Sequence, residues 1–246
     1  MPKNWIFIRG LTRGIVHWGE FAKKFQDLHP DYKIEFIEIP GNGELSEMLT
    51  PGSPEELIEY LRSKSDIVKS AEEYILCGIS LGGMIVLKWA ELYPDKIESV
   101  NVINTSLSQF SPFYKRLIAS NYVKVAAGLF SKNPYQKEKL ILNMTANNAE
   151  SITRYLQIFS DFAKVHSVKK INFIRQLQLA KKIKIDNWKN TKLNVISSTS
   201  DRLVSHSCSK IIAQKLNGNL IVHPSAGHDI PLDDPTWLIQ VLDANN

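Results

Sequence analysis

Residues 76–90, LCGISLGGMIVLKWA, place three glycines around one serine between two apolar segments. Gly78, Gly82 and Gly83 surround Ser80, with an apolar run typical of a buried strand before it and a longer, helix-forming run after it. In this context the pattern G-x-S-x-G predicts a sharp strand-to-helix turn, because glycine has no Cβ atom to clash where the chain reverses. The serine would then lie at a helix N-terminus, whose free N–H groups stabilise negative charge.

The rest of the chain alternates between short apolar strands and amphipathic helices. Strands are predicted at residues 4–11, 33–39, 74–80, 97–107, 192–200 and 219–225. Helices are predicted at residues 17–28, 54–70, 81–94, 205–216 and 237–244. This alternation predicts an α/β fold with a mostly parallel sheet of about six strands and helices on both faces.

Residues 111–187 interrupt the alternation, because only helical periodicity occurs there. We interpret them as a helical cap inserted between the fourth and fifth strands, with residues 1–110 and 188–246 forming the core domain. A cap in this position would cover the carboxyl ends of the strands, where open α/β sheets bind ligands. Its aromatic side chains either shape a substrate pocket or pack the interior of the cap, and the sequence leaves both roles open. They are Phe113, Tyr114, Tyr122, Phe130, Tyr155, Phe159 and Phe162.

Positive charge is concentrated in the same part of the chain. Residues 111–192 contain 16 Lys and Arg against 4 Asp and Glu, although the whole chain has a net charge of only +5. Such an asymmetry indicates either a surface for an anionic partner or a solvated lysine-rich face with no target.

Several classes of protein are disfavoured by composition. There is no run of about 20 apolar residues, and the first residues do not form a signal peptide, so we expect a cytoplasmic protein with no transmembrane segment. The two cysteines, Cys77 and Cys208, indicate a reducing compartment without a disulfide framework. No metal-ligand spacing and no phosphate-binding glycine loop occurs, so we expect no metal, no cofactor and no nucleic-acid partner.

Ser80 has candidate partners later in the chain. A serine hydroxyl is a weak nucleophile that needs a base, and the base needs an orienting acid. Asp201 follows the fifth strand and His228 follows the sixth, so both lie at carboxyl ends of strands, where they would meet Ser80. Asp229 is too close to His228 in sequence to orient it. His17 follows the first strand and is a candidate for lining the cleft.

Five segments together resemble the α/β-hydrolase superfamily along nearly the whole chain. GISLGG resembles its nucleophile elbow, SDRLV its acid turn, AGHDIPLDDP its histidine loop, IPGNGEL the turn after a strand, and RGLTRGIVHW its oxyanion loop. The resemblance implies that the backbone N–H groups of Leu11 and Leu81 bind the oxyanion. Arg9 stands where the family usually has a histidine, and the family's first two strands are missing.

The resemblance to small bacterial serine carboxylesterases implies hydrolysis of an ester through an acyl-serine intermediate, with a small-molecule acyl ester as substrate. Because the nucleophile position is Ser80, it excludes the aspartate-dependent dehalogenases and epoxide hydrolases. One alternative is a methyl ester or thioester hydrolase whose basic cap docks an acidic carrier protein. Others are a non-catalytic ligand-binding module and a peripheral membrane protein that binds phospholipid through the cap. Whether the substrate is an ester, a thioester or a compound cleaved at a C–C bond stays open, as do the acyl chain length and the oligomeric state.

Overall fold

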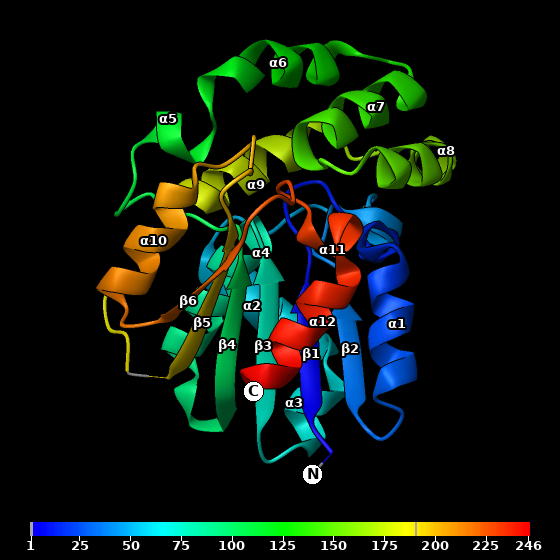
Figure 1. Cartoon of the computed structure of the whole chain (residues 1–246). Coiled ribbons are helices and arrows are strands. Elements are labelled where there is room, and N and C mark those ends of the chain that lie inside the picture. Colours follow the sequence, from blue (N-terminus) through cyan, green and yellow to red (C-terminus); the bar gives the residue numbers. More distant parts are fainter. Residues whose placement is uncertain (1, 190) are drawn as a thin grey trace.

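The computed structural model describes residues 2–189 and 191–246, and all their side chains except those of residues 129 and 130. The side chain of Phe130, one of the aromatic residues named above, therefore lies outside the described part. The described chain folds around one central sheet, with a helical layer above the carboxyl ends of its strands (Figure 1).

The sheet has six strands, all parallel, in the order β2-β1-β3-β4-β5-β6. The strands are β1 Asn4–Ile8, β2 Lys33–Ile37, β3 Tyr74–Ile79, β4 Ile97–Ile103, β5 Lys192–Ser198 and β6 Asn219–His223. The predicted α/β fold with a parallel sheet is therefore confirmed. The chain runs from β1 outward to β2 and then returns to the other side of β1 as β3. The carboxyl ends of β1 and β3 consequently form a topological switch point, where ligands bind in open α/β sheets.

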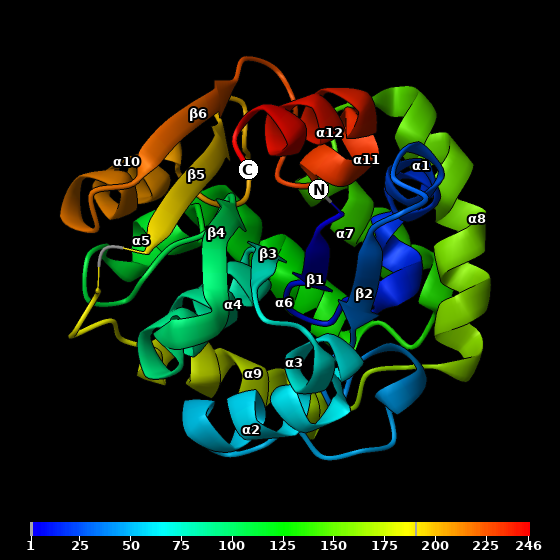
Figure 2. The same ribbon diagram turned by 90° about the horizontal axis from the view of Figure 1, so that it is seen from below.

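Helices cover both faces of the sheet, as the alternation predicted (Figure 2). One face packs against α1 (Glu20–Leu28) and α12 (Pro235–Ala244), with the short α11 (Ile230–Asp233) before α12. The other face packs against α2 (Pro54–Lys64), α3 (Asp66–Ser70), α4 (Leu81–Leu92) and α10 (His206–Lys215).

Strand β1 shows why this layering forms. Trp5 and Phe7 point to the α1 face, where Phe7 makes edge contacts with Phe21 and Phe25, and Ile6 and Ile8 point to the α4 face. Every one of these side chains is buried. A strand buried on both sides reads as a continuous apolar run, which is the pattern seen in the sequence.

The predicted helices differ from the structure at their boundaries, and two of the differences have a clear local cause. The helix predicted over residues 54–70 is divided at Ser65, whose backbone is extended and whose Oγ accepts the Val68 N–H at 3.0 Å. That side chain caps a new helix, α3, in the usual N-cap geometry. The helix predicted from residue 17 begins only after Gly19, which has a φ of 58° and separates α1 from a 3₁₀ turn at Ile15–Trp18.

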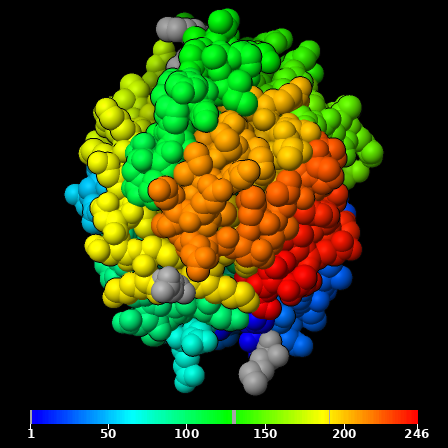
Figure 3. All heavy atoms as spheres, turned by 60° about the vertical axis from the view of Figure 1, so that its left-hand side comes forward, coloured from blue at the N-terminus to red at the C-terminus, as the bar shows by residue number. Residues whose placement is uncertain are grey.

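The segment after β4 contains only helices among its described residues. They are α5 Phe113–Arg116, α6 Tyr122–Phe130, α7 Pro134–Thr145, α8 Ala149–Val165 and α9 Lys170–Lys182, with a 3₁₀ turn at Ala119–Asn121. Its first part lies on the surface of α10 (Figure 3). There the Ser205 N–H donates to the carbonyl of Lys115 at 2.9 Å, and the Ile118 N–H donates to the carbonyl of Leu203 at 2.9 Å.

Candidate active site

Ser80 occupies the turn between β3 and α4 with a φ of 56° and a ψ of −116°, a conformation that side chains rarely adopt. The neighbouring glycines make this turn sterically possible. A Cβ atom on Gly78 would lie 2.3 Å from the carbonyl oxygen of Gly82, and one on Gly82 would lie 2.2 Å from the carbonyl oxygen of Ile8. The glycines around Ser80 are therefore required because α4 starts in direct contact with the backbone of β3 and β1.

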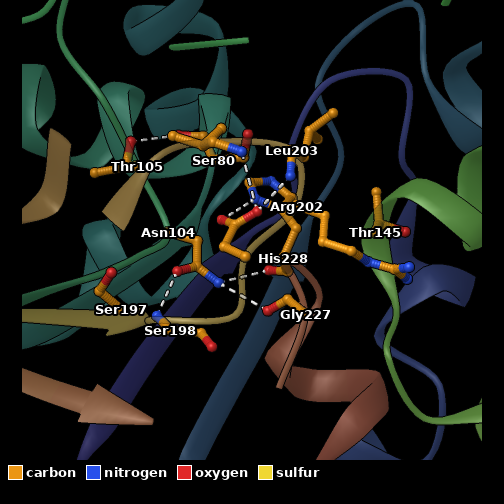
Figure 4. Close-up of polar contacts among 12 residues, drawn as sticks. Ser80, Asn104, Thr105, Thr145, Ser197, Ser198, Arg202, Leu203, Gly227 and His228 are labelled. Atoms are coloured by element: carbon orange, nitrogen blue, oxygen red, sulfur yellow. Dashed lines mark hydrogen bonds and ion pairs between the residues drawn. The ribbon is translucent and has the colours of Figure 1, made fainter. Parts of the chain in front are cut away.

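The end of β4 holds the elbow from the other side (Figure 4). The Ser80 N–H donates to the carbonyl of Ile103 at 2.9 Å, and the Thr105 hydroxyl donates to the carbonyl of Ser80 at 2.6 Å. Gly83 lets Thr105 come this close, because a Cβ atom there would lie 2.8 Å from the Thr105 Cβ. These bonds oppose relaxation of the strained serine.

Asp201 and His228 meet beside this elbow, although 27 positions separate them in the sequence. The Nδ1 atom of His228 lies 2.8 Å from Oδ2 of Asp201, and both residues are buried. The other carboxylate oxygen, Oδ1, accepts the N–H groups of Leu203 at 2.8 Å and Val204 at 3.0 Å. Because an ionised carboxylate only accepts hydrogen bonds, this arrangement places the imidazole proton on Nδ1 and leaves Nε2 free as a base.

No hydrogen bond joins Ser80 to His228 within residues 2–189 and 191–246. Catalytic hydrogen bonds in unliganded enzymes are often long and tighten only when the substrate binds. The strand ends nevertheless bring the serine to the first glycine loop, because a Cβ atom on Gly10 would lie 3.7 Å from Ser80 Oγ.

The two candidate oxyanion donors lie at this junction. Leu11 follows Gly10 directly, and Leu81 is the first residue of α4. In the described part of the chain, neither backbone N–H donates a hydrogen bond. Two free N–H groups beside a serine, one of them at a helix N-terminus, suit the binding of a developing negative charge.

Asn104 is a supporting residue that our sequence analysis missed. It is buried after β4 with a φ of 45°, and its side-chain amide donates to the carbonyls of His228 at 2.8 Å and Gly227 at 3.2 Å. Its Oδ1 accepts the Ser198 N–H at 2.9 Å, so one side chain joins β5 to the histidine loop (Figure 4). The sequence feature that could have revealed Asn104 is an asparagine directly after a strand, because asparagine tolerates a positive φ better than most residues.

Arg9 forms a buried ion pair with Asp229. Nη1 and Nη2 of Arg9 donate to the two carboxylate oxygens of Asp229 at 2.9 and 2.6 Å, and the guanidinium lies 5.0 Å from the centre of the Trp18 ring. The side chains are only 4% and 5% exposed. Arg9 therefore links the loop after β1 to the residue next to His228.

A buried amide network joins α9 to the loop after β1, which carries the candidate oxyanion donor Leu11. Gln176 accepts the Thr12 N–H at 3.0 Å and donates to Oδ1 of Asn42 at 2.7 Å. Asn42 in turn donates to the carbonyl of Arg13 at 3.1 Å. Thr12 has a φ of 60°, so the network holds this loop in a conformation that it would otherwise leave.

His17 is buried after the same loop and lines a cavity of about 230 Å³. Its ring packs against Phe159 and Phe162, at centroid distances of 4.6 and 6.0 Å. Burial lowers the pKa of His17 well below its usual value, and the charges of Arg13 and Arg9 lower it further. Of the aromatic residues in the helical segment, Phe159 and Phe162 thus lie near this cavity, whereas Phe113 and Tyr114 are 63% exposed.

The turn between α7 and α8 is attached to the same loops. Oδ2 of Asp233 accepts the N–H groups of Gly227 at 2.6 Å and Asn147 at 2.8 Å. The Asn147 side chain donates to the carbonyls of Ser200 and Ser225, both at 3.0 Å. Burial raises the pKa of Asp233, and the backbone N–H donors oppose this rise.

Metal sites, membrane-spanning helices and cysteine pairing were searched for among the described residues. Within them, no group of three or more His, Cys, Asp or Glu side chains is placed to hold a metal ion. Across the same residues, no helix has both the length and the apolar character needed to cross a membrane. Cys77 and Cys208 are both buried and free.

Residues 68–235 match the family described as alpha/beta hydrolase fold. This match spans more than half of the chain and includes the elbow, the acid turn and the histidine loop, so the chain belongs to the α/β-hydrolase family. A comparison with curated proteins gave no match.

Solved structures with the same fold include several hydrolases. A lipase-esterase related protein from Clostridium acetobutylicum is 19% identical, with a TM-score of 0.74, and the match covers 100% of this chain and 95% of that one. A thermophilic esterase from Thermogutta terrifontis is 15% identical, with a TM-score of 0.72 and coverage of 99% and 89%. The 2-hydroxy-6-oxo-6-phenylhexa-2,4-dienoate hydrolase of Rhodococcus sp. strain RHA1 is 15% identical, with a TM-score of 0.74 and coverage of 99% and 90%. At these identities the likeness establishes the fold alone.

Proposed function

We propose that this protein is a serine hydrolase that cleaves a carboxylic ester through an acyl-serine intermediate. The observation that carries the proposal is the strained conformation of Ser80 at the N-terminus of α4, next to the buried Asp201–His228 pair. Strain of this kind costs on the order of 1–3 kcal/mol and persists where function requires it. The esterases that share the fold support an ester as the bond to test first.

In the proposed reaction, Ser80 attacks the ester carbonyl carbon while Nε2 of His228 takes the serine proton. Asp201 holds the imidazole by its Nδ1–H and stabilises the imidazolium that forms. The N–H groups of Leu11 and Leu81 bind the oxyanion, and loss of one such donor typically lowers the rate by about 10²–10³-fold. His228 then protonates the leaving alcohol, and water releases the acid in a second cycle.

Residues 111–187 act in this proposal as a cap over the site. The position of these helices supports this role, because α7 and α8 lie above the strand ends and contribute Glu138, Phe159 and Phe162 around His17. A cap in this position would shield the ester at Ser80 from water, which would strengthen the electrostatic stabilisation of the oxyanion.

The test combines covalent labelling with turnover. The purified protein is treated with a fluorophosphonate probe and with p-nitrophenyl esters of increasing chain length, alongside Ser80→Ala and His228→Ala. We expect labelling and turnover in the wild type, and a loss of turnover of at least about 10³-fold in both variants. Ser70→Ala, which removes an exposed serine hydroxyl in α3, is the matched control and should behave like the wild type.

Two outcomes would contradict the proposal. Turnover in Ser80→Ala near the wild-type rate would mean that another nucleophile acts. A folded wild-type protein that neither binds the probe covalently nor hydrolyses any ester would favour a non-catalytic binding module.

A further inference from the structure

The cavity beside His17 lies between the oxyanion loop and the cap helices. It has a volume of about 230 Å³, and residues of α7 and of the end of α8 line it. Its polar lining includes Thr12 and His17 from the core and Lys132, Lys137, Glu138 and His166 from the helical segment. Its apolar lining includes Ile141 and Phe162.

Two connections join this cavity to the proposed nucleophile. Thr12 follows Leu11, the candidate oxyanion donor, by one residue. Helix α7 runs from the cavity to the histidine loop, because its residue Glu138 lines the cavity and its residue Thr145 accepts the Asp229 N–H at 2.8 Å. These two residues of α7 are about 10 Å apart along the helix axis, at 1.5 Å per residue. The cavity therefore borders the loop that carries Leu11, and α7 connects its wall to the loop that carries His228.

His17 offers a hydrogen-bond donor to this space. Its Nδ1 lies 3.0 Å from the Gly14 nitrogen and 3.3 Å from the Gly14 carbonyl oxygen, and we assign the shorter contact as a hydrogen bond donated by the Gly14 N–H, which places the proton of the neutral ring on Nε2. Within the described part of the chain, Nε2 makes no hydrogen bond. Because His17 lines the cavity, a ligand oxygen there could accept a hydrogen bond from this donor.

The charges around the cavity do not balance. Nη1 of Arg13 donates to Oε2 of Glu138 at 2.6 Å, and this buried pair is neutral as a whole. Nη2 of Arg13 is buried without a hydrogen-bond partner among the described residues. Lys132 and Lys137 also line the cavity, and neither forms an ion pair with a described carboxylate. The cavity therefore has an excess of positive charge.

Lys137 is the more enclosed of these two lysines. It is half-buried, whereas Lys132 is exposed at the rim. Burial lowers the pKa of the Lys137 ammonium, which shows that the surroundings have removed part of its hydration. An anion bound beside it would compensate for that loss, since charged hydrogen bonds in poorly hydrated sites are strong.

We propose that this cavity binds the free carboxylate of a half-ester of a dicarboxylic acid, with the Nε2–H of His17 and the ammonium of Lys137 as donors. The inference rests on the proposed function, because it assigns the substrate class to the same site. The carboxylate would lie in the cavity while the ester group lies at Ser80, so the charged end would orient the substrate without entering the reaction.

The test compares two methyl esters of the same chain length. Monomethyl adipate carries a carboxylate at its far end, whereas methyl hexanoate carries a methyl group there. Release of acid is followed by pH-stat titration. We expect kcat/KM to be at least about tenfold higher for monomethyl adipate, mainly through a lower KM, since a hydrogen bond to a charged group is worth about one factor of ten or more.

Variants of α7 assign the preference to the cavity. Lys137→Met should reduce the ratio of the two kcat/KM values by about tenfold, and Lys137→Arg should keep most of it. Lys139→Met is the matched control, because Lys139 is exposed on the same helix and is not among the cavity residues. It should leave the ratio unchanged. Circular dichroism establishes that each variant is folded.

A binding measurement keeps the inference testable if hydrolysis is not found. Titration calorimetry of Ser80→Ala with monomethyl adipate should show binding that Lys137→Met in the same background weakens about tenfold. Equal kcat/KM for the two esters, or equal loss of both in Lys137→Met, would overturn the carboxylate site while leaving the serine hydrolase in place. Absence of both fluorophosphonate labelling and ester turnover would instead count against the proposed function, and the calorimetry would still decide the cavity.

Discussion

The buried pair of Arg9 and Asp229 predicts strong coupling between two residues 220 positions apart. Replacing either residue alone leaves an uncompensated charge in a site where both side chains are at most 5% exposed. Removing one partner of such a pair costs about 3–5 kcal/mol. In a chain of this size, each kcal/mol of lost stability lowers the melting temperature by about 2–4 °C. The melting temperature should therefore fall by about 6–20 °C in both Arg9→Met and Asp229→Leu.

The double variant should behave differently. Arg9→Met with Asp229→Leu removes both charges and fills the space with apolar atoms, which is often neutral for a buried pair. Most of the loss should therefore be recovered, giving a coupling energy of several kcal/mol in a double-mutant cycle. The free energy of unfolding is measured by urea denaturation with far-ultraviolet circular dichroism.

The reasoning has a matched control on the surface. Lys23 and Asp27 also form an ion pair, but their side chains are 79% and 59% exposed. The variant Lys23→Met should change the free energy of unfolding by no more than about 0.5 kcal/mol. If the effects of Arg9→Met and Asp229→Leu add to within about 0.5 kcal/mol in the double variant, the two residues are not coupled and the argument fails.

Three further predictions concern the elbow, the cavity histidine and the amide network. Gly82→Ala should prevent folding or reduce stability severely, because its Cβ would lie 2.2 Å from a backbone oxygen of β1. Gly128→Ala is the control: nothing lies within 4 Å of a Cβ atom there, so it should stabilise α6 by about 0.5–1 kcal/mol. Thermal melts of both variants test this pair of predictions. The pKa of His17 is lowered in the folded state, so its contribution to stability is lost as pH falls below about 6.5. His17→Asn should therefore be less sensitive to acid, by up to about 1.4 kcal/mol between pH 7.5 and 5.5 in urea titrations, and equal slopes would contradict this. Gln176→Ala leaves the N–H of Thr12 without its acceptor and should cost about 1–3 kcal/mol in the same assay; an unchanged midpoint would show that water replaces the side chain.

The fold and the elbow were predictable because their signals are local. Strand and helix periodicities lie within windows of about ten residues, and the steric demand at Ser80 is met by glycines two positions away. The contact between Asp201 and His228 was predictable because parallel strands end at one edge of the sheet, so the residues after β5 and β6 converge there. The division of the helix at Ser65 also had a local signal, since a serine followed by aspartate is a common helix start.

The support around the site was not predictable, because it depends on tertiary packing. Asp229 was set aside as too close to His228 to orient it, and no sequence pattern then assigned it to Arg9 across 220 positions. The contact from Gln176 to Thr12 likewise spans 164 positions and crosses from the helical segment to the core. Periodicity gives the buried face of a helix, but it does not give the partner of a buried polar group.

The attachment of the α7–α8 turn has a consequence for how this protein can change by recombination. Asn147 is bonded to carbonyls near the acid turn and the histidine loop, and Asp233 of the core reaches back to the Asn147 N–H. A helical segment exchanged as a block with that of a relative would lose these bonds unless both partners were inherited together. Asn147 and Asp233 should therefore be exchanged together, although only Asn147 belongs to the inserted segment. Chimeras that transfer both residues should fold more often than chimeras that exchange only the segment between the strand ends.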